Sequence, residues 1–155
     1  MKLNYVIIPI VTVLTAVIGS QFTSSGLGSW YRSINLPAWT PPGSVIGLVW
    51  TTIFTLSTIA ALILWNTPSA KAKLPLFAGI FLLNAVLNVL WSYLFFSQHQ
   101  IGAAIFEAIL LDLTVIALIV LAWPISRLAS ALLMPYAAWV AFASYLTYSV
   151  WKLNR

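Results

Sequence analysis

The acidic, histidine and cysteine residues of this chain are too few for most kinds of catalysis. Glu107 and Asp112 are its only acids, His99 is its only histidine, and it has no cysteine. On a helix, two acids five residues apart project about 140° from each other, so they do not form a pair on one face. One histidine without cysteine supplies neither a zinc site, nor bis-histidine haem ligation, nor a Ser-His-Asp triad. We therefore expect no metal site and no conventional catalytic residues.

Carboxamide and indole side chains are the groups that could bind a ligand. Asn84, Asn88 and Trp91 follow one another at i, i+4 and i+7, which places them on one helical face. Because hydrocarbon penalises unpaired polar groups, two carboxamides in an apolar stretch need partners. Two interpretations remain open: hydrogen bonds between helices, and the wall of a pocket with polar anchors.

Two further apolar stretches carry aromatic residues at helical spacing. Trp50 and Phe54 share one stripe, and Tyr136, Trp139 and Ala143 share another. The chain has 8 tryptophans in 155 residues, and aromatic belts at the membrane surfaces can account for several of them. Trp50 and Trp139 lie deeper than belt residues, so we interpret them as ring-stacking or pocket positions.

The composition places these residues in a membrane protein. Hydrophobic residues make up 62% of the chain and charged residues 6%, whereas soluble domains carry about 25% charged residues. Seven basic and two acidic residues cannot cover a water-facing surface, so the bilayer must solvate most of the exterior. The basic residues are scattered between the apolar stretches, which argues against nucleic acid as the partner despite the net charge of +5.

Five apolar stretches approach or exceed the roughly 20 residues that a membrane-spanning helix requires. We expect an all-α bundle of five transmembrane helices, forming a single domain over residues 1–155, with a retained first helix rather than a cleaved signal peptide. Short junctions make consecutive helices antiparallel neighbours. The five stretches are Tyr5–Phe22, Val45–Asn66, Leu74–Ser97, Ile101–Trp123 and Leu128–Trp151.

The junction between the first two stretches is much longer than the others. Thr23–Ser44 spans 22 residues and contains Trp30, Tyr31 and Trp39 together with three prolines. Loops of this length are uncommon and are often functional, and proline lowers the entropy that ordering must remove. Two interpretations of this long, ordered loop remain open: an aromatic anchor at the membrane surface, and a semi-rigid lid over a pocket between helices.

The loop sequence resembles a known family. Its residues Trp30–Pro42, WYRSINLPAWTPP, are similar to the WYxxLxKPxWxPP signature of the translocator protein family (TspO/MBR, peripheral benzodiazepine receptor, tryptophan-rich sensory protein). Leu36 stands where the family usually has lysine before the proline. The resemblance covers nearly the whole chain. It continues at Val49-Trp50, at Asn84, Asn88 and Trp91, and at Pro135-Tyr136, Trp139–Phe142 and Tyr148–Lys152.

The resemblance implies a multi-pass protein of a bacterial cell membrane, often a homodimer, with a ligand cavity under the first loop. Such a cavity would bind porphyrins and benzodiazepine- or isoquinoline-type drugs. For dimerisation the sequence offers Ala104 and Ala108, a small-xxx-small pair, and Gly79 on the third stretch. Leu146, Tyr148 and Lys152 satisfy a loosely defined sterol-binding pattern. The predicted ligand-binding residues are Tyr31, Pro42, Trp50, Phe54, Asn84, Asn88, Trp91, Trp139 and Ala143.

The implied function is binding of a tetrapyrrole, with protoporphyrin IX or a related ring as ligand or substrate and no tightly bound cofactor. The resemblance also implies light- and oxygen-dependent porphyrin degradation, for which Trp50 and Trp139 are candidate electron donors. Two other classes of function remain open. One is a transporter of tetrapyrroles or other amphipathic molecules, including sterol-like ligands. The other is a ligand-regulated sensory or partner-binding membrane protein without catalysis.

Overall fold

Helices form nearly all of the structure. The computed structural model describes residues 2–155, a range that is all-α and contains no strand. Five segments are long and apolar enough to cross a membrane, which confirms the predicted fold. The long helices are α1 (Asn4–Leu27), α3 (Gly43–Asn66), α4 (Leu74–Ser92), α5 (Ile101–Ala122) and α6 (Arg127–Leu153). They are joined by the short helix α2 (Trp30–Ser33), the 3₁₀ helix η1 (Pro68–Lys73) and the π-helix η2 (Tyr93–Ser97).

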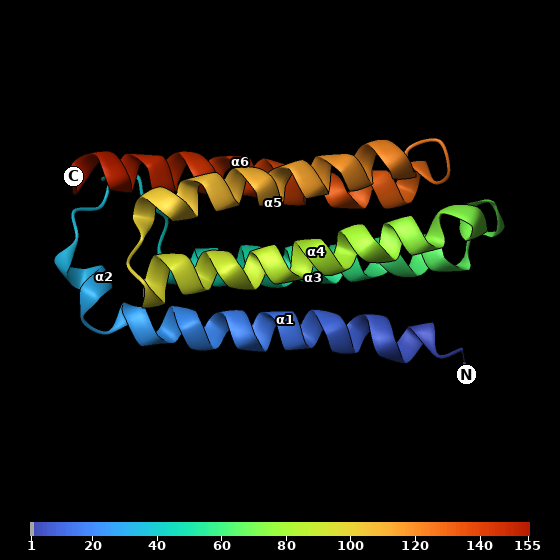
Figure 1. Ribbon diagram of the computed structural model, residues 1–155, viewed down its shortest axis with the longest axis horizontal. Coiled ribbons are helices and arrows are strands. Elements are labelled where there is room, and N and C mark those ends of the chain that lie inside the picture. The colour runs from blue at the N-terminus through green and yellow to red at the C-terminus, as the bar shows by residue number, and fades with distance from the viewer. Residues whose placement is uncertain (1) are drawn as a thin grey trace.

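The long helices form a ring of neighbours. Helix α1 contacts α3 and α4, α4 contacts α5, α5 contacts α6, and α6 returns to α3. In Figure 1, α1 lies along one side of the bundle and α5 and α6 lie along the other. Helix α1 buries only Asn4, Thr15, Gly19 and Gly26. Its attachment therefore depends on small and polar residues rather than on large apolar ones.

The topology separates the connections into two ends. The N-terminus, η1 and the turn between α5 and α6 lie at one end, which we call the N-terminal end (Figure 1). Helix α2, η2 and the C-terminus lie at the opposite end, called the loop end. Lys2 and Lys71 thus belong to the N-terminal end, and Arg32 and Lys152 to the loop end.

The first loop is shorter than predicted, because α1 continues to Leu27. The prediction that the loop begins at Thr23 is wrong. Serine hydroxyls bond to the carbonyls of their own helix, with 3.0 Å from Ser24 Oγ to the Gln21 oxygen and 2.6 Å from Ser25 Oγ to the Phe22 oxygen. These local hydrogen bonds let a polar sequence remain helical beyond the apolar run.

The remaining loop is fixed to the bundle at two places. The Trp30 ring stacks on the His99 ring with centroids 4.2 Å apart. The backbone N–H of Asn35 donates to Asn154 Oδ1 over 2.8 Å, and Asn154 Nδ2 donates to the Asn35 carbonyl over 2.9 Å. The loop therefore bridges the end of η2 and the end of α6.

The small residues singled out for dimerisation lie in different environments. Ala104 and Ala108 are 0% and 2% exposed within a single chain, so the prediction that they form an intermolecular face is wrong. Their small size instead lets α5 approach its neighbours inside the bundle. Gly79 is exposed, and a side chain added there would meet nothing within 4 Å. Of the three, Gly79 alone remains available for contact with another molecule.

A substitution at Gly26 should test the packing between α1 and η2. A Cβ atom at this position would lie 2.5 Å from the Phe96 carbonyl oxygen, so the backbone must shift. We expect Gly26→Ala to destabilise the protein by about 1–3 kcal/mol, as overpacking usually does. Thermal unfolding in detergent measures this effect. Gly28→Ala is the matched control, because nothing lies within 4 Å of its Cβ position. Equal melting temperatures for the two variants would contradict the close approach.

Candidate functional site

A polar network joins three helices in the middle of the bundle. The Tyr136 hydroxyl on α6 donates to Asn84 Oδ1 over 2.9 Å and accepts from Asn88 Nδ2 over 3.1 Å. Asn84 Nδ2 donates over 2.8 Å to the Thr114 hydroxyl on α5, which donates to the Leu111 carbonyl over 2.7 Å. Asn84 and Asn88 thus have the interhelical partners that one of the two interpretations of their spacing required.

Aromatic rings surround this network. Trp50 on α3 lies edge-on to Tyr136 with centroids 6.0 Å apart, and 5.6 Å from Phe54. Trp139, one turn beyond Tyr136, packs against Phe142 at 5.3 Å. Trp50 and Trp139 both flank a buried core that includes Tyr136. The predicted electron donors Trp50 and Trp139 therefore lie close to the carboxamides of Asn84 and Asn88.

A second aromatic layer lies between this network and the first loop. Trp91 stacks on Phe95 with centroids 5.1 Å apart, and Tyr31 of α2 packs against Phe96 at 5.7 Å. Burial raises the pKa of the Tyr31 phenol above its ordinary value of 10.0. The π-helix supplies both phenylalanines as adjacent inward residues, since both are buried. Tyr31 and Trp91 are therefore held together by η2.

Two of the predicted ligand-binding indoles have unused donors. The Nε1 atoms of Trp91 and Trp139 are buried and have no hydrogen-bond partner among residues 2–155. Buried polar groups in proteins are almost always paired, so each exception needs an explanation. An acceptor on a bound molecule would supply one.

The other predicted residues are more dispersed. Pro42 is exposed where α3 begins, and Ala143 is half-buried on α6. In the sterol pattern, Leu146 packs beneath the loop, whereas Tyr148 is 43% exposed and Lys152 is exposed. Whether a ligand contacts any of the predicted residues stays a prediction, although the fold gathers four of them around Tyr136, namely Trp50, Asn84, Asn88 and Trp139.

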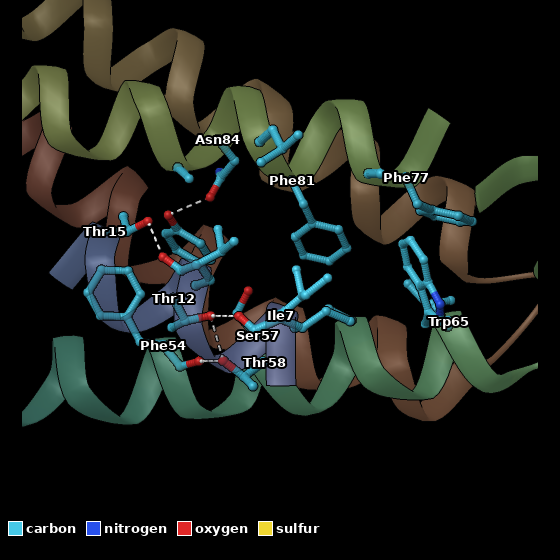
Figure 2. Close-up of a pocket in the computed structure, with 18 of the residues that line it drawn as sticks. Ile7, Thr12, Thr15, Phe54, Ser57, Thr58, Trp65, Phe77, Phe81 and Asn84 are labelled. Carbon is cyan, nitrogen blue, oxygen red and sulfur yellow. Dashed lines mark hydrogen bonds between the residues drawn. The ribbon is translucent and has the colours of Figure 1, made fainter. Parts of the chain in front are cut away.

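A cavity of about 260 Å³ begins beside the polar network and extends away from the first loop. It lies between α1, α3 and α4, and Phe54 and Asn84 are the predicted residues that line it. Figure 2 shows hydroxyl and carboxamide groups gathered at one end and the rings of Trp65 and Phe77 at the other. Its volume is below the roughly 300–1,000 Å³ of most ligand pockets.

Sequence reasoning missed the contribution of α1 to this cavity. The Thr12 hydroxyl lies 2.8 Å from that of Thr58 on α3, and Thr15 also lines the wall. The available signal was the spacing of Thr12 and Thr15, which places both on one face of an otherwise apolar helix. Tyr136 was recognised as part of a stripe but not as the residue that joins the two carboxamides.

The fold and the site define an integral multi-pass membrane protein with a polar and aromatic interior. Comparison with known proteins agrees with this class. The model of the TspO/MBR family matches residues 6–152, and the chain belongs to this family.

Named relatives come from distant organisms. The chain is 36% identical to "Tryptophan-rich protein TspO" of Bacillus cereus over 126 residues, which cover 81% of each protein. It is 33% identical to "Translocator protein" of Homo sapiens over 145 residues, covering 92% of this chain and 85% of the human protein. It is 32% identical to "Protein CrtK" of Rhodobacter capsulatus over 127 residues, covering 82% and 79%.

Removal of the Tyr136 hydroxyl should destabilise the bundle. In Tyr136→Phe, Asn84 loses a donor and Asn88 loses an acceptor, while both remain buried. We expect a loss of about 1–2 kcal/mol in the free energy of unfolding in detergent. Tyr148→Phe, at a 43% exposed position on the same helix, is the control and should change little. Equal stability of both variants would mean that the network does not hold α4 to α6.

Proposed function

We propose that this protein binds tetrapyrroles in the membrane and promotes the light- and oxygen-dependent degradation of protoporphyrin IX. The same site would take benzodiazepine- or isoquinoline-type ligands. The observation that supports this function best is that the buried indole N–H groups of Trp91 and Trp139 have no hydrogen-bond partner among the described residues, in a member of the TspO/MBR family. Both indole N–H groups lie beside the region where the carboxamides of Asn84 and Asn88 meet the aromatic rings.

The chemistry of this region suits a flat ring with acceptor groups. Indole and phenol rings stack on aromatic ligands, and each such pair contributes about 0.5–1.5 kcal/mol beyond burial. The unpaired indoles supply donors for carboxylate or carbonyl oxygens. At the loop end, exposed Arg32 on α2 offers a guanidinium for a propionate group. We therefore expect the porphyrin to stack against Trp50, Trp91 and Trp139 with its acidic edge toward the loop. None of these residues lines either described cavity, so binding there requires the surrounding rings to move.

The residues present favour a metal-free tetrapyrrole over tightly held haem. His99 is exposed outside the helical spans, and its ring is stacked on Trp30. The usual axial ligands of haem iron are histidine, cysteine, methionine and tyrosine. Tyr136, near the centre of the network, uses its hydroxyl to join two carboxamides. It is therefore poorly suited to bind iron.

Degradation would begin with an electron transfer between indole and porphyrin. A photoexcited porphyrin gains one electron from an adjacent tryptophan, which becomes the oxidised partner. The reduced porphyrin passes this electron to dioxygen, which becomes superoxide, and the oxidised tryptophan takes an electron back from the porphyrin ring. The resulting porphyrin radical cation combines with superoxide, so the tryptophan is restored and the net reaction is oxidation of the ring by dioxygen. Trp50 and Trp139 are the candidate donors, because both pack beside the polar network.

Phenylalanine substitutions should separate binding from degradation. Trp50→Phe and Trp139→Phe keep an aromatic ring but lose the readily oxidised indole. We expect each variant to bind protoporphyrin IX within about threefold of the original affinity and to bleach it severalfold more slowly under light. Absorbance and fluorescence titrations give the occupancy, and illumination at equal occupancy gives the rate. Trp123→Phe, at an exposed position at the end of α5, is the control.

Three results would change this proposal, and the last two would favour another function. Unchanged bleaching in both variants would remove these indoles from the mechanism. Protein-dependent flux of a fluorescent porphyrin across proteoliposomes, without light-driven products, would favour a transporter of amphipathic molecules. Absence of both activities, with binding retained, would favour a ligand-regulated sensory protein.

A further inference from the structure

The cavity beside α1 continues toward the N-terminal end of the bundle. A second cavity adjoins the first, and the two share Ile7, Ile8, Trp65 and Leu74 in their walls. From Asn4 to Thr15, the positions that border the joined cavity on α1, the helix rises about 16 Å. The result is an elongated hollow between α1, α3 and α4, on the side of the network away from the first loop.

The two parts of this hollow differ in chemistry. The walls of the inner part are mainly aliphatic and aromatic side chains, including Val11, Ala61 and Phe81. The outer part is bordered by Lys2, Asn4, Asn66 and Lys71. Glu107 and Asp112, the two acids of the chain, are both on α5 and line neither part. The mouth therefore carries two positive charges without a compensating carboxylate.

The mouth also contains an unused buried donor. Asn4 is 8% exposed, and its Nδ2 atom has no partner within the described part of the chain. Lys2 Nζ donates to Asn66 Oδ1 over a long 3.4 Å, and an ammonium group has further donors. A buried amide and two ammonium groups are a donor set for an anion, whereas the hollow behind them suits hydrocarbon.

We propose that the joined cavity binds a single-chain anionic amphiphile, a fatty acid carboxylate, drawn from the surrounding membrane. The carboxylate lies at the Asn4 amide between Lys2 and Lys71, and the hydrocarbon chain lies between α1, α3 and α4. Helix α1 is weakly attached, because it buries mostly small and polar residues. The fatty acid can therefore enter sideways from the bilayer, past α1. The cavity adjoins the proposed tetrapyrrole site at Phe54 and Asn84, but Lys2, Asn4 and Lys71 at its mouth are not residues of that site. Substitutions at the mouth therefore test this proposal independently of the tetrapyrrole site.

Laurate carrying bromine on its chain is a suitable probe, because bromine quenches the fluorescence of an indole that it contacts. Trp65 lines both parts of the cavity, so titration of the protein in nanodiscs with brominated laurate should quench a component that Trp65→Phe removes. Trp123→Phe should leave that component in place, since Trp123 lines neither part. Equal quenching in the original protein and Trp65→Phe would overturn the proposed chain position.

Charge reversal should show whether the lysines recognise the carboxylate. We expect Lys71→Glu to weaken binding about tenfold or more, in line with the loss of a hydrogen bond to a charged group. Lys73→Glu is the matched control, because it lies on the same short helix η1 but borders neither part of the cavity. It should change the affinity less than twofold. Equal effects would mean that surface charge alone attracts the probe, and would overturn the site.

Filling the hydrocarbon part provides an independent variant. Ala78→Phe places a ring in the cavity, whereas Gly79→Phe, one residue further, projects into open space. We expect the first to abolish Trp65-dependent quenching and the second to preserve it, with both variants still binding protoporphyrin IX. Folding is checked by their elution as single species and by their helical content. Retained quenching in a folded Ala78→Phe variant would contradict occupation of this cavity.

Competitors identify the occupant. Unlabelled laurate should displace the probe, whereas lauryl alcohol should do so at least tenfold less well, because it lacks the charge that the mouth selects. Phosphatidylglycerol should also compete poorly, since its second acyl chain has no place in one elongated hollow. Equally effective displacement by either would overturn the proposal, in favour of unselective hydrocarbon filling or of a resident phospholipid respectively.

Discussion

Within the bilayer, polar side chains must form their hydrogen bonds with other groups of the protein. In this bundle, such hydrogen bonds from two carboxamides meet at the Tyr136 hydroxyl. This hydroxyl joins two carboxamides of α4 to α6, and Asn84 extends the chain of hydrogen bonds to Thr114 on α5. Unpaired, these groups would each cost several kcal/mol in hydrocarbon. The network therefore fixes the rotation of three helices about their axes. Trp139 lies one turn beyond Tyr136 on α6, and Trp50 on α3 packs edge-on against the Tyr136 ring, so both indoles take their positions from this network.

The bundle is divided by this network into two regions of different character. Toward the loop end, rings from α2, α4 and η2 pack closely, and two buried indole N–H groups have no partner within residues 2–155. Toward the N-terminal end, α1 stands against α3 and α4 with a hollow between them. One region offers donors and stacking surfaces, whereas the other offers hydrocarbon contact behind a cationic mouth. A single small fold thus provides two environments that suit chemically distinct amphipathic molecules.

Much of this arrangement could be predicted from the sequence. Apolar runs identified the five spans, and the i, i+4, i+7 spacing correctly placed Asn84, Asn88 and Trp91 on one face. The end of α1 could not be predicted from hydropathy, because the apolar run ends near Phe22. The helix continues to Leu27, since serine hydroxyls bond to its own carbonyls. The choice between hydrogen bonding and a pocket wall was also beyond sequence reasoning, since it depends on which residue of another helix faces each carboxamide. For the same reason, Ala104 and Ala108 looked like a contact face although they fill the interior.

The π-helix at the end of α4 has a consequence for how this chain tolerates insertions and deletions. A π-turn holds one residue more than an α-turn. The side chains after Ser92 are therefore rotated about the helix axis relative to the positions that a regular α-helix would give them. This rotation lets adjacent Phe95 and Phe96 both face inward, beneath Trp30 and Tyr31 of α2. Loss of one residue from Tyr93–Ser97 would restore a regular helix but turn one of these rings toward lipid. The length of this short segment is thus constrained more tightly than the identity of most residues around it.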